Sequence, residues 1–178
     1  MTGPLAEGED RETLFRHWLE EHAGLVFKVA RAYTATDADR DDLVQEILLQ
    51  LWCSLPKFEA RAKESTWIYR VALNTALAWN RKQTKHYAAQ TPLIAVEDLP
   101  AQQTHLGREE REEIITRLYS AIQQLPKVDA ALVLLYLDNL SYREMAEVLG
   151  ISESNVGVKL NRAKKALAEL MKEVAYES

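Results

Sequence analysis

The segment from Leu140 to Leu167 constrains the fold most strongly, because its pattern predicts two helices joined by a tight turn. Ser141 and Glu144 have the spacing of a capping box, in which two side chains satisfy free backbone amides at a helix start. Gly150 can end this first helix, and Ser152 can cap the second. The apolar residues expected to face the core are Met145, Ala146 and Leu149 in the first helix and Val156, Leu160, Ala163 and Leu167 in the second.

The opposite face of the second helix is polar and basic. Residues 154–168 hold four basic residues and no acidic residue. Two helices around a glycine turn, the second with a basic outer face, are typical of a helix-turn-helix that fits the DNA major groove. A solvated helical hairpin at a domain end would show the same periodicity, so both interpretations stay open. The candidate DNA-contacting residues are Ser154, Asn155, Val158, Lys159, Asn161, Arg162 and Lys165.

The overall charge has the wrong sign for a protein that holds DNA by charge alone. The chain of 178 residues has a net charge of -5 and a pI near 5.5. If about four basic residues paired with phosphates, the slope of the logarithm of the binding constant against the logarithm of the salt concentration (the salt slope) would be roughly -3.6. This corresponds to weak binding to duplex DNA. A larger partner therefore has to supply the remaining contacts, which indicates a subunit of an assembly.

Cysteine and histidine usage argue against a metal or redox site. Cys53 is the single cysteine, which excludes an intramolecular disulfide and suits a reducing compartment. His17 and His22 lack a second ligand set at metal-like spacing, so we interpret them as surface or capping side chains.

The longest apolar run, residues 130–137, is too short to span a bilayer, and the acidic N-terminus is unlike a signal peptide. We expect a cytoplasmic protein without membrane insertion, cofactor, metal or catalytic residues.

Composition predicts an all-α fold of two small helical domains joined by a flexible linker. Residues 88–108 have turn and linker composition and no helical period. We therefore expect an N-terminal domain over 1–87, a linker over 88–108, and a C-terminal helix-turn-helix domain over 109–178.

Residues 41–55 predict a helix with two different faces. Its expected core face carries Val44, Ile47, Leu48, Leu51 and Leu55, and its outer face carries Asp42, Gln45, Glu46, Leu49 and Cys53. The acidic residues alone would indicate a solvated face. Leu49 among them raises the alternative of a partner surface, and the sequence leaves both open.

Residues 66–85 predict a basic helix. Its expected core side carries Ile68, Val71, Ala72, Thr75 and Trp79, and a second side carries Trp67, Arg70, Asn74, Leu77 and Arg81, flanked by Tyr69 and Asn80. Cations, flat rings and amides together suit single-stranded nucleic acid, which needs charge for its backbone and rings for its bases. The alternative is that Trp67 and Tyr69 are ordinary core aromatics.

Three segments taken together resemble bacterial sigma factors of the extracytoplasmic-function (ECF, group IV) class. They are DDLVQEILLQLW, TWIYRVALNTAL and LSYREMAEVLGISESNVGVKLNRAKKAL, in the family's order and spacing, within a resemblance over about residues 12–170. The resemblance implies a dissociable subunit that binds core RNA polymerase and directs it to specific promoters. It also explains how an acidic protein could act on DNA, because the polymerase would supply most DNA contacts. Anti-sigma factors are common partners in this family, although no residue here identifies one.

The resemblance assigns roles by position. Asp42, Gln45, Glu46 and Leu49 fall in the polymerase-binding helix. Arg61, Lys63, Trp67, Arg70, Asn74 and Arg81 fall where the family holds the melted minus-ten element, with residues 59–65 as the loop that captures a flipped base. The residues from Ser154 to Lys165 fall in the helix that reads the minus-thirty-five element as duplex DNA. The acidic linker would thread toward the polymerase cleft.

Two departures from the family pattern bear on base preference. The loop reads Ala60-Arg61-Ala62-Lys63-Glu64, where the family usually has glycine, an acid, two small residues and an aromatic. The second helix of the helix-turn-helix has Gly157 and Val158, where the family often has lysine and serine. Two other functions stay open from the sequence: a dimeric helix-turn-helix regulator that acts without polymerase, and a helical scaffold that binds only proteins.

Overall fold

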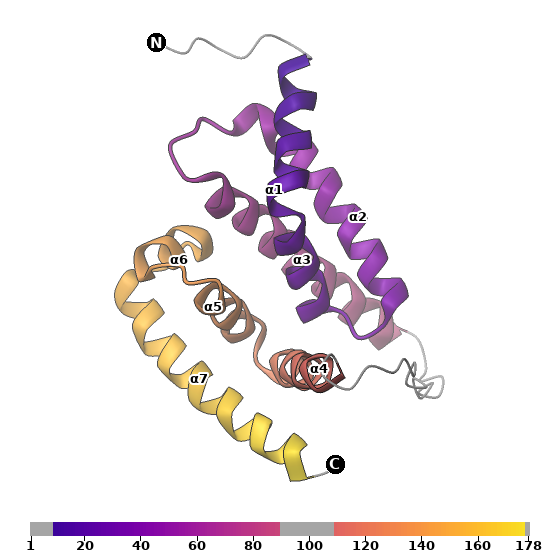
Figure 1. Ribbon diagram of the computed structural model, residues 1–178, viewed down its shortest axis with the longest axis vertical. Coiled ribbons are helices and arrows are strands. Elements are labelled where there is room, and N and C mark those ends of the chain that lie inside the picture. The colour runs from indigo at the N-terminus through magenta and orange to yellow at the C-terminus, as the bar shows by residue number, and fades with distance from the viewer. Residues whose placement is uncertain (1–8, 90–108, 177–178) are drawn as a thin grey trace.

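The computed structural model describes residues 9–89 and 109–176 (Figure 1). This part of the chain contains seven α-helices, one short 3-10 helix and no strand, which confirms the all-α prediction. The expected linker over 88–108 lies outside the described residues, except that the third helix continues through Ala89. No helix in the described ranges combines the length and the apolar character that a bilayer crossing requires.

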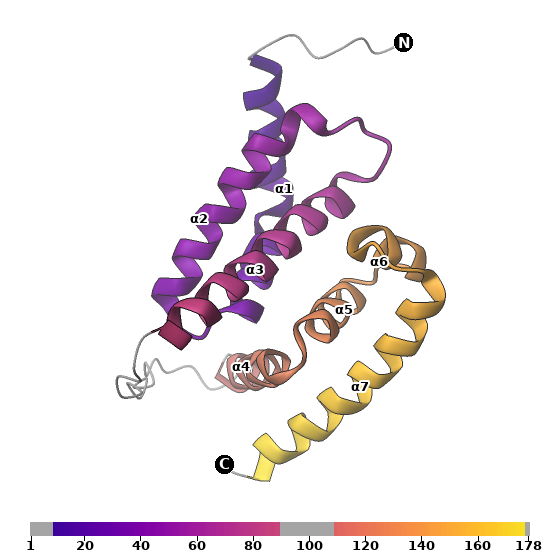
Figure 2. The same cartoon turned by 180° about the vertical axis from the view of Figure 1, so that it is seen from behind.

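The first three helices lie side by side and form one unit. They are α1 (Glu9–Tyr33), α2 (Asp37–Ser54) and α3 (Glu64–Ala89), with the 3-10 helix η1 (Leu55–Lys57) directly after α2. Trp18 of α1, Ile47 and Leu51 of α2 and Ile68 of α3 are all buried in the core between them. The α2–α3 connection leaves the bundle at one end of α2 (Figure 2). The predicted loop over 59–65 extends two residues too far, because Glu64 and Ser65 already belong to α3.

Helix α2 begins at Asp37, so the predicted start at Asp41 was wrong by about one turn. Thr36 is the N-cap, and its hydroxyl oxygen accepts a hydrogen bond from the amide of Asp39. Asp37 and Asp39 then place negative charge at the positive end of the helix. These short polar residues precede the apolar pattern, so periodicity alone does not detect them.

The buried face of α3 is rotated relative to the prediction. Ile68 and Ala72 are buried as expected, but Trp79 is only half-buried, whereas Tyr69 and Leu73 are fully buried. The reason is tertiary, because α3 contacts not only α1 and α2 but also α6 of the second unit. Tyr69 is therefore a core aromatic, which decides one of the alternatives left open above.

The second unit consists of α4 (Glu109–Gln124), α5 (Lys127–Leu137), α6 (Tyr142–Leu149) and α7 (Glu153–Tyr176). Ser141 and Glu144 form both hydrogen bonds of the predicted capping box, and Gly150 ends α6 in the left-handed conformation with φ 66°. The hydroxyl of Ser152 accepts a 3.2 Å hydrogen bond from the amide of Asn155 at the start of α7. The predicted helix-turn-helix is thus confirmed as α6, the glycine turn and α7.

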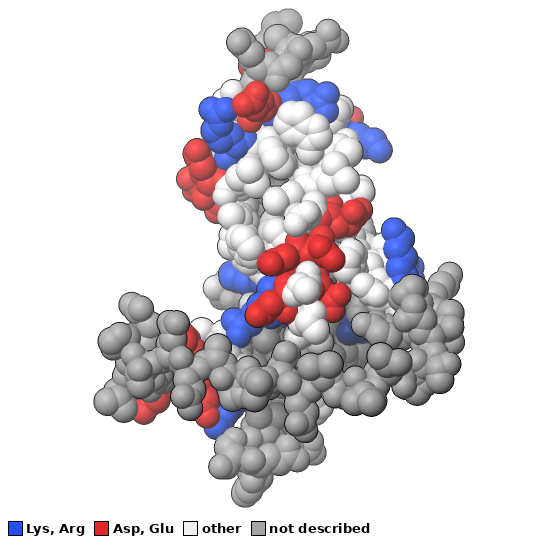
Figure 3. Space-filling model, turned by 90° about the vertical axis from the view of Figure 1, so that its right-hand side faces the viewer, with Lys and Arg blue, Asp and Glu red and all other residues white. Residues whose placement is uncertain are grey.

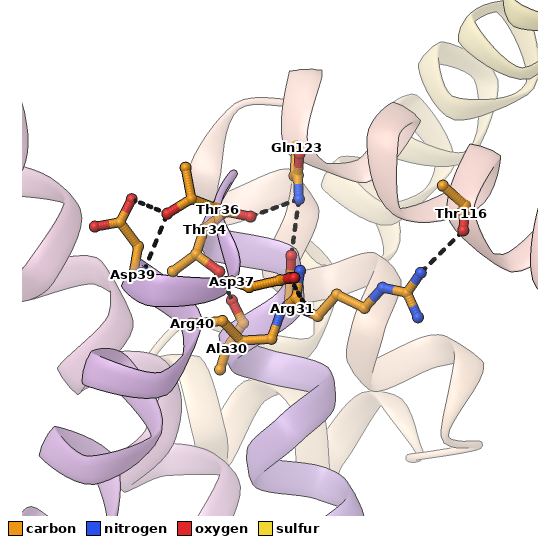
Figure 4. Close-up of polar contacts among 9 residues, drawn as sticks. All are labelled: Ala30, Arg31, Thr34, Thr36, Asp37, Asp39, Arg40, Thr116 and Gln123. Carbon is orange, nitrogen blue, oxygen red and sulfur yellow. Dashed lines mark hydrogen bonds and ion pairs between the residues drawn. The ribbon is translucent and has the colours of Figure 1, made fainter. Parts of the chain in front are cut away.

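Helix α1 packs against the second unit through α4 and α5 (Figure 4). The side-chain amide of Gln123 in α4 donates to the backbone oxygens of Arg31, in the last turn of α1, at 2.8 Å and of Thr34, just after the helix, at 2.7 Å. It thus pairs carbonyls at a helix end, where backbone partners within the helix run out. Arg31 itself donates to the hydroxyl of Thr116 at 3.1 Å. Farther along, the Tyr33 hydroxyl donates to the backbone oxygen of Lys127 at 2.7 Å, and burial raises the pKa of that hydroxyl.

Candidate nucleic-acid and partner interfaces

The outer face of α2 combines acidic, amide and apolar side chains. Asp42, Gln45 and Leu49 are exposed, Leu49 by 54%, and Glu46 is half-buried. The amide of Gln50 donates to Glu46 at 3.0 Å, which holds the Glu46 carboxylate along the helix. Figure 3 shows a group of acidic side chains on this side of the molecule, with a broad uncharged surface above it. A single exposed leucine is common on protein surfaces, so a partner surface requires a second apolar side chain beside it.

Trp52 extends this face, and the sequence reasoning missed it. It lies three residues after Leu49 and is 37% exposed. Its ring meets Phe15 of α1 edge-on at a centroid distance of 5.3 Å, and the Arg11 guanidinium lies 5.5 Å from its centre. The spacing of Gln45, Leu49 and Trp52 along one helical stripe was the signal that could have found it.

The exposed side of α3 carries three of the residues predicted to contact the minus-ten strand. Arg70, Asn74 and Arg81 are all exposed. An open groove of about 320 Å³ lies between α2 and α3, and its lining includes Glu46 from one helix and Asn74 and Lys82 from the other. The groove therefore connects the outer face of α2 to the basic side of α3.

Trp67 has a packing role at the start of α3. It is half-buried, its ring lies 5.8 Å from that of Phe58, and its indole N–H donates to the Ser54 hydroxyl at 3.2 Å. Phe58 in turn packs edge-on against Trp18 at 5.2 Å. The indole thus belongs to an aromatic row that leads into the core.

The loop before α3 holds Arg61 and Lys63, the remaining candidates for the minus-ten element. Arg61 is exposed and pairs with Glu59 at 2.8 Å. Lys63 reaches across to the second unit, where its ammonium lies 2.6 Å from the Glu144 carboxylate of α6. Ala60, which replaces the family's usual loop glycine, has a φ of 54°. A non-glycine residue in this left-handed conformation costs about 1–2 kcal/mol.

Glu144 is expected to make the protein acid-sensitive. The hydrogen bond from Lys63, followed by those from Ser141, lowers the pKa of Glu144 from 4.5 to about 2. A carboxylate with a lowered pKa in the folded state contributes stability above its unfolded pKa and loses it as pH falls toward its folded pKa. The melting temperature of the wild type should therefore fall more steeply between about pH 4.5 and 2 than that of Glu144→Gln. Circular dichroism melts measure this, with Glu147→Gln as the control, and parallel curves for wild type and Glu144→Gln would contradict it.

The outer face of α7 carries the predicted duplex-reading residues. Ser154, Asn155, Asn161, Arg162 and Lys165 are exposed. Val158 is 70% exposed, and Lys159 is half-buried. Nη2 of Arg162 also donates to both carboxylate oxygens of Asp129 in α5, each at 3.2 Å.

Gly157 lies beneath the ring of Tyr142, the first residue of α6. A Cβ built at position 157 would meet Cε2 of Tyr142 at 3.5 Å, which is ordinary van der Waals contact. Gly157→Ala should therefore stabilise the protein by about 0.5–1 kcal/mol, because alanine has the higher helix propensity. Urea denaturation measures the change. A loss of stability would show that Tyr142 cannot accommodate the methyl group.

His17 and His22 approach one carboxylate. Their Nε2 atoms lie 3.3 and 3.8 Å from one oxygen of Glu64, the first residue of α3. Both therefore link α1 to the start of α3. His17 is exposed, in keeping with the surface interpretation, whereas His22 is half-buried.

Two family matches follow the two helical units. The family described as "Sigma-70 region 2" matches residues 18–86, and "Sigma-70, region 4" matches residues 115–167. Together they cover more than half of the chain, in the order of the family and on the helices described above. The chain belongs to the sigma-70 family, in its ECF group. This sigma factor binds core RNA polymerase and directs promoter-specific transcription initiation.

Individual relatives agree with this assignment. The sigma factor is 28% identical over 144 residues to the ECF RNA polymerase sigma factor SigW of Bacillus subtilis, which covers 76% of this chain and 77% of SigW. It is 27% identical over 164 residues to the RNA polymerase sigma factor YlaC of the same organism, covering 90% of this chain and 91% of YlaC.

Two solved structures have the same fold. One is the sigma factor RpoE of Bartonella quintana in complex with the anti-sigma factor NepR, with a TM-score of 0.71 at 20% identity, covering 90% of this chain and 98% of RpoE. The other is CnrH in complex with the cytosolic domain of CnrY, with a TM-score of 0.64 at 21% identity, covering 91% and 90%.

Proposed function

We propose that three surfaces of this sigma factor divide the work of initiation. The outer face of α2 binds core RNA polymerase, α3 with its preceding loop holds the melted minus-ten element, and α7 reads the minus-thirty-five element as duplex. The observation that carries the proposal is that Leu49 and Trp52, 54% and 37% exposed, lie on one stripe of α2 beside polar residues, because neighbouring exposed apolar side chains mark an interaction site.

The polymerase-binding role of α2 is supported by its mixture of anchors and polar groups. Leu49 and Trp52 supply apolar area of the kind that dominates protein interfaces, and Asp42, Gln45 and Glu46 supply a polar rim. The net charge of -5 supports a partner as well, because this chain cannot hold DNA tightly by its own charge.

The minus-ten role of α3 is supported by the exposure of Arg70, Asn74 and Arg81 along one helix. Cations can follow a phosphate backbone, and an amide can bond a base edge. Arg61 and Lys63 extend the basic surface into the loop. Lys63 would exchange the Glu144 carboxylate for a phosphate when promoter DNA arrives, so its ion pair would break in the open complex.

The minus-thirty-five role of α7 is supported by the stripe of polar and basic residues in the first half of the helix. Residues near the N-terminus of a recognition helix contact base edges, which favours Ser154, Asn155 and Val158 as readers. Val158 can contact a thymine methyl group. Lys159 and Lys165 lie where they can pair with phosphates on either side.

Two further points belong to the same proposal. The similar structures of RpoE and CnrH are complexes with NepR and with the cytosolic domain of CnrY, which supports an anti-sigma factor as a second partner of this chain. Core polymerase works in the cytoplasm, so we place this sigma factor there. Its own residues bind the polymerase and orient the promoter DNA, and the polymerase performs the chemistry.

The proposal is tested by pull-down of core RNA polymerase with the full chain, followed by run-off transcription from a pool of genomic promoters. We expect both binding and promoter-dependent transcripts. Tight promoter binding without polymerase would favour a stand-alone regulator, and binding to neither polymerase nor DNA would favour a protein scaffold.

Promoter opening should depend on α3. Asn74→Ala and Arg70→Ala should each lower permanganate reactivity of the minus-ten strand severalfold, because they remove contacts that exist only on melted DNA. Binding to core polymerase should stay near the wild-type value. Thr84→Ala, an exposed change on the same helix, is the matched control. Equal promoter melting by the wild type and Asn74→Ala would contradict the assigned role.

A further inference from the structure

Asp129 is the only acidic residue buried among those the structure describes. It is 3% exposed and lies in the first turn of α5. A buried carboxylate is unfavourable unless a positive or hydrogen-bonding partner compensates it. The partner here is Arg162, whose Nη2 lies 3.2 Å from each Asp129 oxygen.

Arg162 connects this buried acid to the surface of α7. Its side chain is 65% exposed even though one nitrogen is held by Asp129. Val158 lies four residues before it and Lys165 three residues after it, so all three share one stripe of the helix. The ion pair therefore lies beside the face proposed to read duplex DNA, where α5 packs against α7 (Figure 2).

The pairing has two consequences for Arg162. A guanidinium has five N–H donors in a rigid plane, and fixing one nitrogen leaves the others with a defined direction. This reduces the rotamer freedom that the side chain would otherwise lose on binding DNA. In addition, Asp129 balances the charge of Arg162, so the pair as a whole contributes little to counterion release.

We propose that Asp129 is a positioning residue for promoter readout: it orients the Arg162 guanidinium and neutralises it, so that Arg162 adds base preference and little non-specific affinity. The inference rests on the proposed duplex-reading role of α7. By contrast, Lys165 forms no ion pair among the described residues and would act on phosphates alone.

The test measures holoenzyme binding to a promoter library randomised in the minus-thirty-five element, at several salt concentrations. Asp129→Asn should reduce base preference at one or two positions by about fivefold or more, which corresponds to losing a well-aligned arginine contact. It should also steepen the salt slope by about one, because Arg162 becomes an uncompensated cation. Arg162→Ala should reduce base preference at the same positions, and the double variant should lose no more preference than either single variant.

Glu169→Gln is the matched control, because it removes one negative charge from α7 without contacting Arg162; its partner is Lys172. It should leave base preference unchanged. Lys165→Ala should lower binding to all sequences about equally. If Asp129→Asn loses more than about 5 °C in melting temperature, Arg162→Lys tests the pair from the α7 side, since lysine keeps the charge but lacks the planar fork.

Two outcomes would overturn the inference, and they are distinguishable. If Asp129→Asn and Arg162→Lys both keep the base preference of the wild type, Asp129 is only a structural contact between α5 and α7. A wild-type holoenzyme without any preference in this element would refute the proposed role of α7 itself, and this inference with it.

Discussion

Alanine at Gln45, Glu46 and Leu49 together is expected to weaken binding to core RNA polymerase at least tenfold, which corresponds to about 1.4 kcal/mol. Leu49 is exposed in the isolated chain, so its burial against a partner would be a gain available only in the complex. Folding should be little affected, because Gln45 and Leu49 are exposed and Glu46 is half-buried, and substitutions at such surface positions usually change stability by less than about 0.5 kcal/mol each. A titration of labelled protein against purified core enzyme measures the affinity.

A matched set on another helix separates a specific interface from a general effect of surface change. Gln124, Glu112 and Ile114 of α4 are the same kinds of residue and are also exposed. Their replacement by alanine should leave polymerase affinity within about twofold. Unchanged affinity of the α2 variant would remove this face from the mechanism, and Trp52→Ala would then show whether the interface lies farther along α2.

Trp67→Ala is expected to lower the stability of the protein by about 2–3 kcal/mol, which would reduce the melting temperature by about 4–12 °C. The indole packs on Phe58 and donates to the Ser54 hydroxyl at the end of α2, so its removal leaves a cavity beside Phe58 and breaks one hydrogen bond between α2 and α3. A side chain waiting in solvent for a base would show almost no such loss. Thermal denaturation followed by circular dichroism measures the difference.

Two variants make this result interpretable. Trp67→Phe keeps a ring on Phe58 but removes the indole donor, and it should lose less than half as much stability as alanine. Arg70→Ala, three residues later on the exposed side, should have a melting temperature close to that of the wild type. An unchanged melting temperature for Trp67→Ala, together with lost promoter opening, would establish Trp67 as a base-stacking residue.

Local signals were sufficient for the helix-turn-helix. The capping box at Ser141, the glycine turn at Gly150 and the cap at Ser152 are all present where the spacing predicts them. Each depends on contacts between residues two to four positions apart, so a short stretch of sequence contains the necessary information. The same holds for the buried stripe of α7, where Val156, Leu160 and Ala163 are all fully buried.

Periodicity was less informative where a helix has neighbours on several sides. Helix α5 is buried continuously from Asp129 to Leu135, because α1, α4, α6 and α7 all contact it. The core face of α3 is likewise rotated toward Tyr69 and Leu73 by its contact with α6. A helical wheel assumes one buried stripe, so it cannot identify faces that depend on a second partner helix.

The sequence by itself determined the helical fold, the caps of α6 and α7 and the outward side of α2 and α7, because periodicity and capping are local properties of the chain. Only the tertiary structure decided which polar side chains meet. Tyr69 donates to Asp138 across 69 positions, Lys63 pairs with Glu144 across 81, and Arg162 is held by Asp129 across 33. These pairs occur because packing brings distant helices together, and burial then requires each charged or polar group to find a partner. No spacing rule within a single helix contains that information.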